Sequence, residues 1–446
     1  MLASRAVRPP WPGIALIAAA AVAVEMAVSA RYGYVRDELY FLSAGQHLAF
    51  GYVDQPPLTP LLARISAAVT GNTLVGLRIL PALALATLVV MTAAMSRRLG
   101  AGRTGQLLAA LAAATCAEYL GTMHELTTTP PDLVFWAVTL LLVMQLLASQ
   151  DQRWWVAVGG CVGVASEAKW NIGFLVAALA AGLACTEARR LLRSRYLLIG
   201  ALIAAALAAP DVVWQATHGW PGLDVFRALQ TEAGHNRAVY WPGQIVYTGV
   251  VLTPVWVAGA IWSLRSAAAR RFRPVAIACV AVIALQFVLG GKAYYPGAAF
   301  TFLLAAGCVP LERRLAAGPR ARRTQHGRRT QRGRAWPGRL VAPAVLAGAA
   351  MVAGAVLAAP VALSVLPARA LHTVLLQKIN YDLAETIGWP KLVALIAQEY
   401  GSLPAAQRRR TTILADNYGE AGAPVFIATG LKSSWAQAWP AFRNYS

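Results

Sequence analysis

Long apolar segments alternate with short polar ones along most of the 446 residues of this chain. A helix that crosses a membrane needs about 20 mostly apolar residues, and the pattern predicts eleven such segments, of which the fifth and sixth are short. The sequence therefore predicts an all-α polytopic membrane protein with about 11 transmembrane helices. The expected spans are 12–30, 74–96, 105–122, 131–149, 154–167, 170–185, 196–214, 242–263, 274–290, 297–311 and 340–366.

The basic residues predict how these spans are oriented. Lys and Arg gather in alternate loops, which is typical of the cytoplasmic side of a membrane protein. The remaining loops hold the acids and most of the loop aromatics, so one orientation fits every loop, with the N-terminus inside and the C-terminus outside. Arg5 and Arg8 before the first span indicate a retained signal anchor. The expected outer segments are 31–73, 123–130, 215–241, 291–296 and 367–446.

Composition narrows the class of protein. With 58% hydrophobic and only 13% charged residues, the chain is not an ordinary soluble enzyme. A net charge of +21 suggests nucleic acid, but the charge lies in the inter-span loops, so no nucleic-acid partner is expected. The basic, low-complexity loop 312–339 predicts a disordered cytoplasmic tether near anionic lipid.

The chain changes character after residue 366. Charged residues become frequent, which divides the sequence into a membrane domain, 1–366, and a soluble extracytoplasmic segment, 367–446. Helical spacing of apolar residues predicts a helix over 389–400, and Thr411–Ala415 reads as a strand before a glycine-containing turn at 417–422. The segment is expected to be a small α/β appendage.

Three carboxylates stand in the first outer loop, and they are the first candidates for chemistry. Asp37 and Glu38 follow the first span directly, and Asp54 follows them in the same loop. Charged groups held close to hydrocarbon are costly and are usually functional. A solvated loop that merely ends a helix is the alternative, but the neighbouring aromatic residues make this loop too apolar for that purpose.

Two further outer loops carry candidate residues. Asp132 follows Pro130-Pro131 and could either be functional or simply favour the start of a helix. The turn 290–296 holds Lys292, Tyr294 and Tyr295, which could bind a phosphate through charge and hydroxyl groups. A lysine that only extends its ammonium towards the membrane surface is the alternative for Lys292.

Other ionisable residues are expected to be structural. Glu167 and Lys169 lie between the two short spans and predict an internal ion pair or a cytoplasmic turn. Glu25 and Glu118 lie within spans, where neighbouring helices are expected to satisfy them. The chain also lacks a Walker A loop, a Gly-rich nucleotide fingerprint, an HExxH motif and a nucleophile elbow. If the protein is a transferase, a lipid-carried donor is therefore the natural substitute for a nucleotide-bound one.

The motifs also resemble a known family. Residues 36–58 (Arg-Asp-Glu-Leu-Tyr through Tyr-Val-Asp-Gln-Pro-Pro-Leu) look like the first outer loop of bacterial family-39 glycosyltransferases. That group is similar to the protein O-mannosyltransferases and to the aminoarabinose transferases that modify lipid A. Segments 128–136, 214–221, 291–295 and 417–423 continue the resemblance in the family's order. The first motif is long and specific, and the others are individually weak.

The resemblance implies a GT-C fold: a multi-span helical bundle whose active site lies at the outer face and uses a polyprenyl-phosphate sugar. It places Asp37 at the family's catalytic acid and Glu38 beside it in the acidic pair of the mannosyltransferases. Asp54 falls at the acid of the second part of the loop, and Asp132 at the acid of the next outer loop. These acids would position the acceptor or hold a divalent cation.

The resemblance also implies contacts to the lipid phosphate. Lys292 and Tyr294 or Tyr295 fall near the family's phosphate-contacting positions, and Arg36 could assist them. One departure concerns the same group, because Gln55 stands where the aminoarabinose transferases carry a lysine. After Ala423 the tail no longer reads like the family, so the appendage is expected to be truncated or diverged.

Together these features predict a glycosyltransferase of the bacterial cytoplasmic membrane. It would move a hexosyl or pentosyl group from a polyprenyl-phosphate donor to a hydroxyl or phosphate acceptor, with inversion, on a protein, lipid or polysaccharide. No cofactor is certain, and a divalent cation stays open. The competing interpretation is a multi-span transporter or flippase, which should show internal repeats or broken spans in matching halves; neither is evident in the sequence.

Overall fold

The structure, a computed structural model, describes residues 8–317, 341–371, 380, 382–411, 413–415 and 417–427. Within these ranges the regular structure is helical throughout. The N-terminal half comprises α1 Trp11–Val28, α2 Arg36–Gln46, α3 Leu58–Thr70, α4 Leu74–Arg98, α5 Arg103–Ala114, α6 Ala117–Thr122, α7 Thr129–Ser149, α8 Trp154–Ser166, α9 Ile172–Ala184, η1 Glu187–Arg193 and α10 Arg195–Thr217. The remainder comprises α11 Pro221–Gln230, α12 Ala233–Thr248, α13 Thr253–Arg265, η2 Ala267–Phe272, α14 Arg273–Leu289, α15 Ala299–Ala317, α16 Val341–Ala362, η5 Ala368–Ala370, α18 Asp382–Glu385, α19 Trp389–Ser402, α20 Ala405–Arg408 and α21 Tyr418–Ile427.

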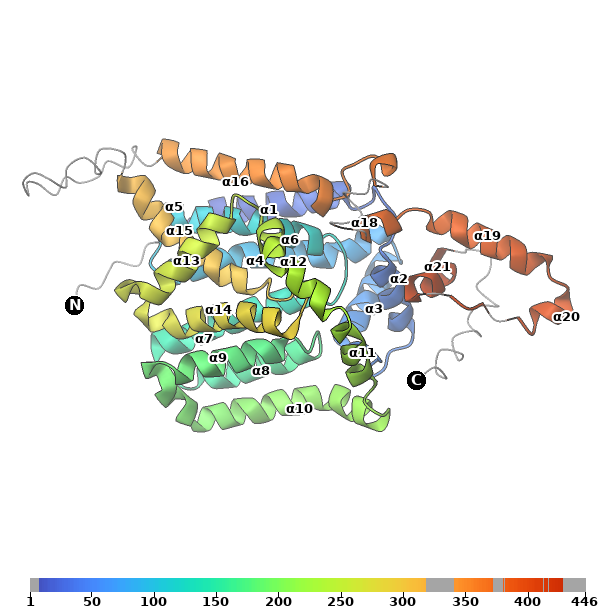
Figure 1. Cartoon of the computed structure of the whole chain (residues 1–446), viewed down its shortest axis with the longest axis horizontal. Coiled ribbons are helices and arrows are strands. Elements are labelled where there is room, and N and C mark those ends of the chain that lie inside the picture. The colour runs from blue at the N-terminus through green and yellow to red at the C-terminus, as the bar shows by residue number, and fades with distance from the viewer. Residues whose placement is uncertain are drawn as a thin grey trace, which may run out of the picture.

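The apolar helices lie side by side in one bundle, with most of their axes along the long axis of the molecule (Figure 1). In the described part of the chain, six helices are long and apolar enough to cross a membrane, and two bent pairs, α9 with η1 and α12 with α13, would raise that number to eight. This confirms an all-α polytopic membrane protein. Each expected span contains a helix, but the number of full crossings, about 11, stays a prediction.

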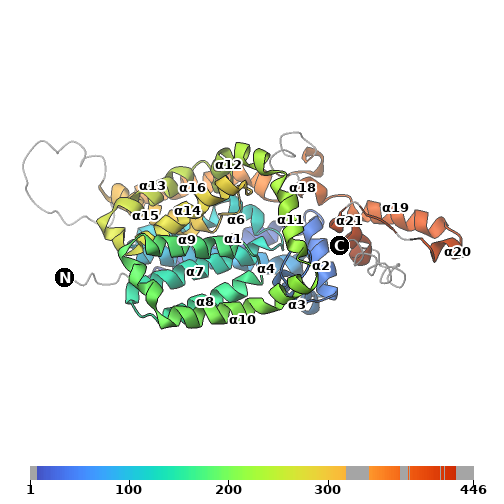
Figure 2. The ribbon, with the colours of Figure 1, turned by 60° about the horizontal axis from the view of Figure 1, so that its bottom comes forward.

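The two ends of the bundle differ in chemistry. The loops predicted to be cytoplasmic meet at one end, where Arg98 donates to Gln145 and the backbone N–H of Gly102 donates to Glu312. At the other end, α2, α3 and α11 lie together with the C-terminal helices, on the right in Figures 1 and 2. The side assignment drawn from the charge pattern thus corresponds to two physical ends of the bundle.

The first outer loop folds into two short helices that cover the second of these ends. A glycine at position 45 lets α2 and α3 approach closely, because a Cβ there would lie 2.9 Å from the carbonyl oxygen of Pro60. The motif at 214–221 contacts this loop through a hydrogen bond: the side chain of Gln215 donates to the carbonyl oxygen of Tyr52 at 2.7 Å. The loop that carries the candidate acids is therefore part of the packed structure.

The C-terminal segment departs from the sequence prediction in one respect. The helix expected over 389–400 is present as α19. The strand expected at Thr411–Ala415 is not: of these residues the structure describes all but 412, and none is in a strand. No neighbouring strand is available among the described residues to pair with it, and Leu414 is 87% exposed. The described part of the appendage is helical, which corrects the α/β prediction.

The predicted turn at 417–422 is also helical. Asn417 accepts a hydrogen bond from the backbone N–H of Glu420 and so caps the start of α21. Gly419 and Gly422 then face α2 so closely that a Cβ at Gly419 would lie 2.4 Å from the Cβ of Arg36. The segment therefore packs directly on the helix that carries the first acids. The tether expected over 312–339 lies mostly outside the described residues, and α15 continues to Ala317.

Candidate active site at the acidic end of the bundle

Asp37 and Glu38 are neighbours in the first turn of α2, but their side chains have different surroundings. Glu38 is completely buried and forms a two-pronged ion pair with Arg78 of α4, with Nε–Oε1 and Nη2–Oε2 distances of 2.9 and 2.8 Å. It also accepts the backbone N–H of Val35 at 2.9 Å, which caps the start of α2. Glu38 is thus fully engaged in structure.

Arg78 completes this buried cluster. Its remaining donors reach the carbonyl oxygens of Ser29 at 2.6 Å and Gly33 at 3.0 Å, and Glu38 accepts a further N–H from Leu126 at 3.3 Å. The pair therefore ties together the end of α1, the first outer loop, α4 and the loop before α7. Buried ions are stable only when they are paired and hydrogen-bonded in this way, and here both requirements are met.

Asp37 faces the C-terminal segment and remains partly accessible, with 34% of its side chain exposed. Its Oδ1 accepts the hydroxyl of Tyr418 from α21 at 2.6 Å. Arg36 lies beside it, with a 3.6 Å Nε–Oδ1 distance, and its guanidinium also covers the Tyr418 ring and approaches Glu385 at 3.6 Å. Desolvation and the neighbouring Asp37 charge raise the pKa of Tyr418, so it stays a hydrogen-bond donor.

Asp54 joins the same group through a second tyrosine. The hydroxyl of Tyr40 donates to Asp54 Oδ1 at 2.6 Å, and the Tyr40 ring packs on Tyr418 with 4.9 Å between ring centroids. Desolvation raises the pKa of Asp54, and the Tyr40 hydrogen bond partly opposes that shift. Asp37 and Asp54 are therefore linked by two tyrosines whose tilted rings are in contact, one from each end of the chain.

Asp132 lies in the first turn of α7 and is buried. Its Oδ2 accepts a hydrogen bond from Asn171 at 3.2 Å, and Asn171 in turn accepts one from Gln286 and donates to the carbonyl oxygen of Tyr295. Its Oδ1 has no hydrogen-bond partner among the described residues. The network fixes Asp132 relative to α9, α14 and the turn 290–296, which is more than a helix start requires.

Lys169 brings these separate elements together. It lies in the turn between α8 and α9 and is partly buried. Desolvation lowers its pKa, and the charge of Asp132 opposes that shift. Lys292, Asp37 and Glu118 also act on its charge. This position corrects the prediction of a cytoplasmic turn or an ion pair with Glu167: the turn is at the acidic end, where the carbonyl oxygen of Glu167 accepts the backbone N–H of Leu58.

The turn 290–296 completes the cluster. The ammonium of Lys169 lies 5.8 Å from the ring centroid of Tyr294 and 5.2 Å from that of Tyr295, in the range of a cation–π contact. The two tyrosine rings meet edge to face at 5.1 Å. Lys292 adds a second positive charge close enough to disfavour the charge on Lys169. Two neighbouring positive charges repel each other, and nearby anions such as the carboxylate of Asp132 or a bound phosphate offset that repulsion.

Gln55 and Arg36, which the sequence analysis considered in relation to the lipid phosphate, both make contacts within the protein. Gln55 is 3% exposed, and its carbonyl oxygen accepts the N–H of Tyr52. Arg36 interacts with Asp37, Glu385 and Tyr418, as described above. Lys169, which sequence reasoning set aside, supplies positive charge in the site instead.

A second cluster combines Glu, His and Ser in the order of a catalytic relay, but all three side chains are buried and inaccessible to a substrate. We call it the closed cluster. His124 contacts Glu25 Oε2 through Nδ1 at 2.9 Å and the Ser364 hydroxyl through Nε2 at 2.8 Å. All three are at most 4% exposed, and burial lowers the pKa of His124 to about 3. The cluster joins α1 to the segment after α16. Glu25 is thus satisfied at Oε2 only, because its Oε1 has no hydrogen-bond partner among the described residues, and neither oxygen of Glu118 has one.

The arrangement of the acids bears on the metal that the sequence left open. Within the described ranges, no three His, Cys, Asp or Glu side chains come together as a set of metal ligands. Asp37 and Asp54 are each engaged by a tyrosine hydroxyl, and Asp132 by an amide. The residues therefore do not form a metal site by themselves, and no step below is routed through a cation.

Comparison with known proteins supports the resemblance drawn from the motifs. A sequence model of the dolichyl-phosphate-mannose-protein mannosyltransferase family matches residues 54–214, a segment that includes Asp54, Asp132 and Lys169. A search of curated proteins returned no match.

The fold has clear counterparts among solved structures. ArnT from Cupriavidus metallidurans, solved with undecaprenyl phosphate, is similar over 96% of this chain and 87% of its own, with 15% identity and a TM-score of 0.60. Its apo structure gives the same coverage, 14% identity and a TM-score of 0.56. The oligosaccharyltransferase of Archaeoglobus fulgidus is similar over 93% of this chain and 63% of its own, with 13% identity and a TM-score of 0.53.

The chain is thus a multi-span membrane protein with the GT-C glycosyltransferase fold, and the predicted resemblance is confirmed. The individual site residues are a separate matter, because the comparisons concern family and fold. Their roles are argued below from their surroundings.

Proposed function

We propose that this protein transfers a sugar from a polyprenyl-phosphate donor to a hydroxyl or phosphate acceptor at the outer face of a bacterial cytoplasmic membrane. The observation that supports it best is the convergence on Lys169: its partly buried ammonium lies against the rings of Tyr294 and Tyr295. Charges from α2, α7 and the turn 290–296 also act on its pKa. An acidic group beside a cationic group is what sugar transfer from a phosphate requires. ArnT, which shares the fold, binds undecaprenyl phosphate.

Asp37 is the proposed general base. Its carboxylate is partly exposed, and the hydrogen bond from Tyr418 fixes the orientation of one oxygen. As the acceptor hydroxyl attacks the anomeric carbon, Asp37 takes its proton and the bond from that carbon to the phosphate oxygen breaks. Attack opposite the leaving group inverts the anomeric centre. A phosphate acceptor would already be ionised and would need Asp37 less.

Lys169 and Lys292 are the proposed contacts of the leaving phosphate. The departing lipid phosphate gains negative charge, and two ammonium groups in a site of low polarity stabilise it. Tyr294 and Tyr295 flank Lys169 and restrict its position. No general acid is needed, because a phosphate monoester leaves as a stable anion. Asp132 orients Lys169, and Asp54 with Tyr40 lies where the acceptor would approach Asp37.

Glu38 has a positioning role in this proposal. Its ion pair with Arg78 fixes the first turn of α2 and therefore the adjacent Asp37. This assigns different tasks to the two members of the acidic pair, although the resemblance places both near catalysis.

The test is a transfer assay with the purified full chain in lipid vesicles. It uses a panel of radiolabelled polyprenyl-phosphate sugars and a crude envelope fraction as acceptor, and compares the wild type with Asp37→Asn. Asp224→Asn serves as the matched control, because Asp224 is an exposed acid of α11, 72% accessible and paired with the equally exposed Arg227. Label should reach an acceptor with the wild type and the control, but not with Asp37→Asn.

Two results would contradict the proposal. One is equal transfer by Asp37→Asn and the wild type. That result would contradict the role of Asp37 as general base but not the transferase activity itself. The other is uptake of a solute into vesicles without consumption of any donor that the protein binds, which would favour the transporter.

A further inference from the structure

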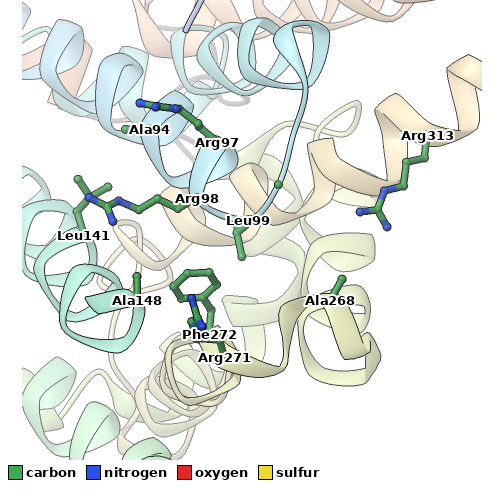
Figure 3. Close-up of a pocket in the computed structure, with 11 residues that line it drawn as sticks. Ala94, Arg97, Arg98, Leu99, Leu141, Ala148, Ala268, Arg271, Phe272 and Arg313 are labelled. Carbon is green, nitrogen blue, oxygen red and sulfur yellow. The ribbon is translucent and has the colours of Figure 1, made fainter. Parts of the chain in front are cut away.

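A basic cavity lies at the end of the bundle opposite the candidate active site. It has a volume of about 650 Å³, opens to the surface and is lined by residues of α4, α7, α15 and the η2 segment. Four arginines line it: Arg97 and Arg98 end α4, Arg271 comes from η2, and Arg313 comes from α15. In Figure 3, Arg97 and Arg98 extend to the left, Arg313 stands on the right and Arg271 lies beside Phe272, with Leu99 in the middle.

The positive charge of this cavity is not compensated by the described residues. No Asp or Glu is among the residues that line it. Glu312 precedes Arg313, but its carboxylate accepts the backbone N–H of Gly102 at 2.7 Å, at the start of α5. Neither Arg97 nor Arg271 has a hydrogen-bond or salt-bridge partner in the described part of the chain, whereas Arg98 donates to Gln145 and Arg313 covers the Trp262 ring.

Arginine identifies the class of ligand. A guanidinium presents a planar fork of donors that matches phosphate oxygens, and it is the preferred cation for phosphate recognition. Four of them around one cavity repel one another unless an anion binds. The volume also exceeds that of an isolated phosphate, and the apolar side chains of Leu99, Leu141 and Phe272 contribute to the lining. The cavity therefore suits an amphiphilic molecule with a phosphate group.

We propose that this cavity binds the phosphate of an anionic phospholipid headgroup from the membrane leaflet opposite the active site. Of the elements that form it, α4, α7 and η2 with α14 are long and apolar enough to cross a membrane, and basic pockets between such helices on the cytoplasmic side are suited to anionic headgroups. The same leaflet would attract the basic loop predicted over 312–339 from the sequence. This site is separate from sugar transfer and does not depend on it.

The experiment measures lipid binding by native mass spectrometry on the delipidated full chain in detergent. The probes are a short-chain phosphatidylglycerol, a phosphatidylcholine of the same chain length, and inorganic phosphate. The variant is Arg97→Gln with Arg271→Gln. The control is Arg189→Gln with Arg193→Gln, which removes the same charge from exposed positions of η1 at the same end of the bundle but outside the cavity. Arg313→Gln is a second variant.

The wild type should bind one phosphatidylglycerol in preference to phosphatidylcholine. The cavity variant should bind it about tenfold or more weakly, as loss of charged hydrogen bonds implies. Arg313→Gln should weaken it in the same direction, and the η1 control should leave it unchanged. Equal weakening by the cavity variant and the control would overturn the proposal, because it would show a diffuse charge effect. Tight binding of inorganic phosphate without the lipid would overturn the lipid source.

Discussion

Asp37 and Glu38 are adjacent in the sequence, yet their side chains differ in burial and in their interaction partners. Glu38 is completely buried, shares two hydrogen bonds with Arg78 and accepts two more from the backbone. Asp37 is partly exposed, is held by one tyrosine and an adjacent arginine, and lies within electrostatic reach of Lys169. A carboxylate whose oxygens are all hydrogen-bonded within the protein stabilises the fold. A carboxylate that remains accessible beside a cationic group can take part in catalysis.

The largest expected effect follows from removing the accessible carboxylate. Asp37→Asn should lower the transfer rate by roughly 10²–10⁴-fold, the usual contribution of a general base. The thermal midpoint should change little, because the asparagine can still accept the Tyr418 hydroxyl. Initial rates with a saturating lipid donor, read beside the Asp224→Asn control, check this. A wild-type rate would show that Asp37 is not the base.

Removing the buried carboxylate should act on stability instead. Glu38→Gln leaves Arg78 without its counter-ion, and breaking a buried pair costs about 3–5 kcal/mol. The thermal midpoint in detergent should fall sharply, and the rate per folded molecule should fall less than in Asp37→Asn. Replacing both partners, Glu38→Leu with Arg78→Met, should recover part of the midpoint. If Glu38→Gln keeps the wild-type midpoint, the comparison between the two acids fails.

Lys169→Gln tests the cationic part of the site. Loss of one charged contact to phosphate, about 1.5–3 kcal/mol, should weaken binding of polyprenyl phosphate by roughly ten- to a hundredfold. Lys391→Gln is the control, because Lys391 is exposed on α19. Binding is measured with the sugar-free lipid phosphate, which separates the anion site from catalysis. Unchanged affinity in Lys169→Gln would place the phosphate elsewhere.

The smallest effect concerns the closed cluster of Glu25, His124 and Ser364. Burial lowers the pKa of His124 from its ordinary 6.5 to about 3, so the unfolded chain takes up a proton at this residue before the folded protein does. Stability should therefore decline as pH falls from about 6.5 towards 3. His124→Gln should flatten this decline and change the transfer rate at neutral pH by less than about twofold, since a closed cluster contacts no substrate. Thermal midpoints across this pH range measure it, and a large loss of transfer would indicate a catalytic relay.

The sequence predicted the helical membrane fold and the end at which the acids gather, because span length and loop charge are local properties that survive folding. It did not separate Asp37 from Glu38, since the partner of Glu38 is 40 residues away in α4. One signal was available: Arg78 inside an apolar span requires an acid partner. The structure shows that partner to be Glu38.

Lys169 was missed for a different reason. Alternation of the loops assigns the turn between α8 and α9 to the acidic side, but the short spans around it and the adjacent Glu167 suggested an ordinary ion pair. Its actual neighbours, Asp132 and the tyrosines of the turn 290–296, come together only through tertiary packing. The strand predicted at 411–415 was wrong for a related reason. A strand forms only beside a neighbouring strand, and local propensity does not reveal whether one is present.

Single-turnover transfer tests the central claim most directly. Wild-type protein and Asp37→Asn are each loaded with labelled lipid donor, the bound fraction is measured, and excess acceptor is added. The account predicts equal donor binding and a transfer step slowed by roughly 10²–10⁴-fold in Asp37→Asn. Equal transfer rates, or a variant that cannot bind the donor at all, would contradict the assignment of Asp37 as the base.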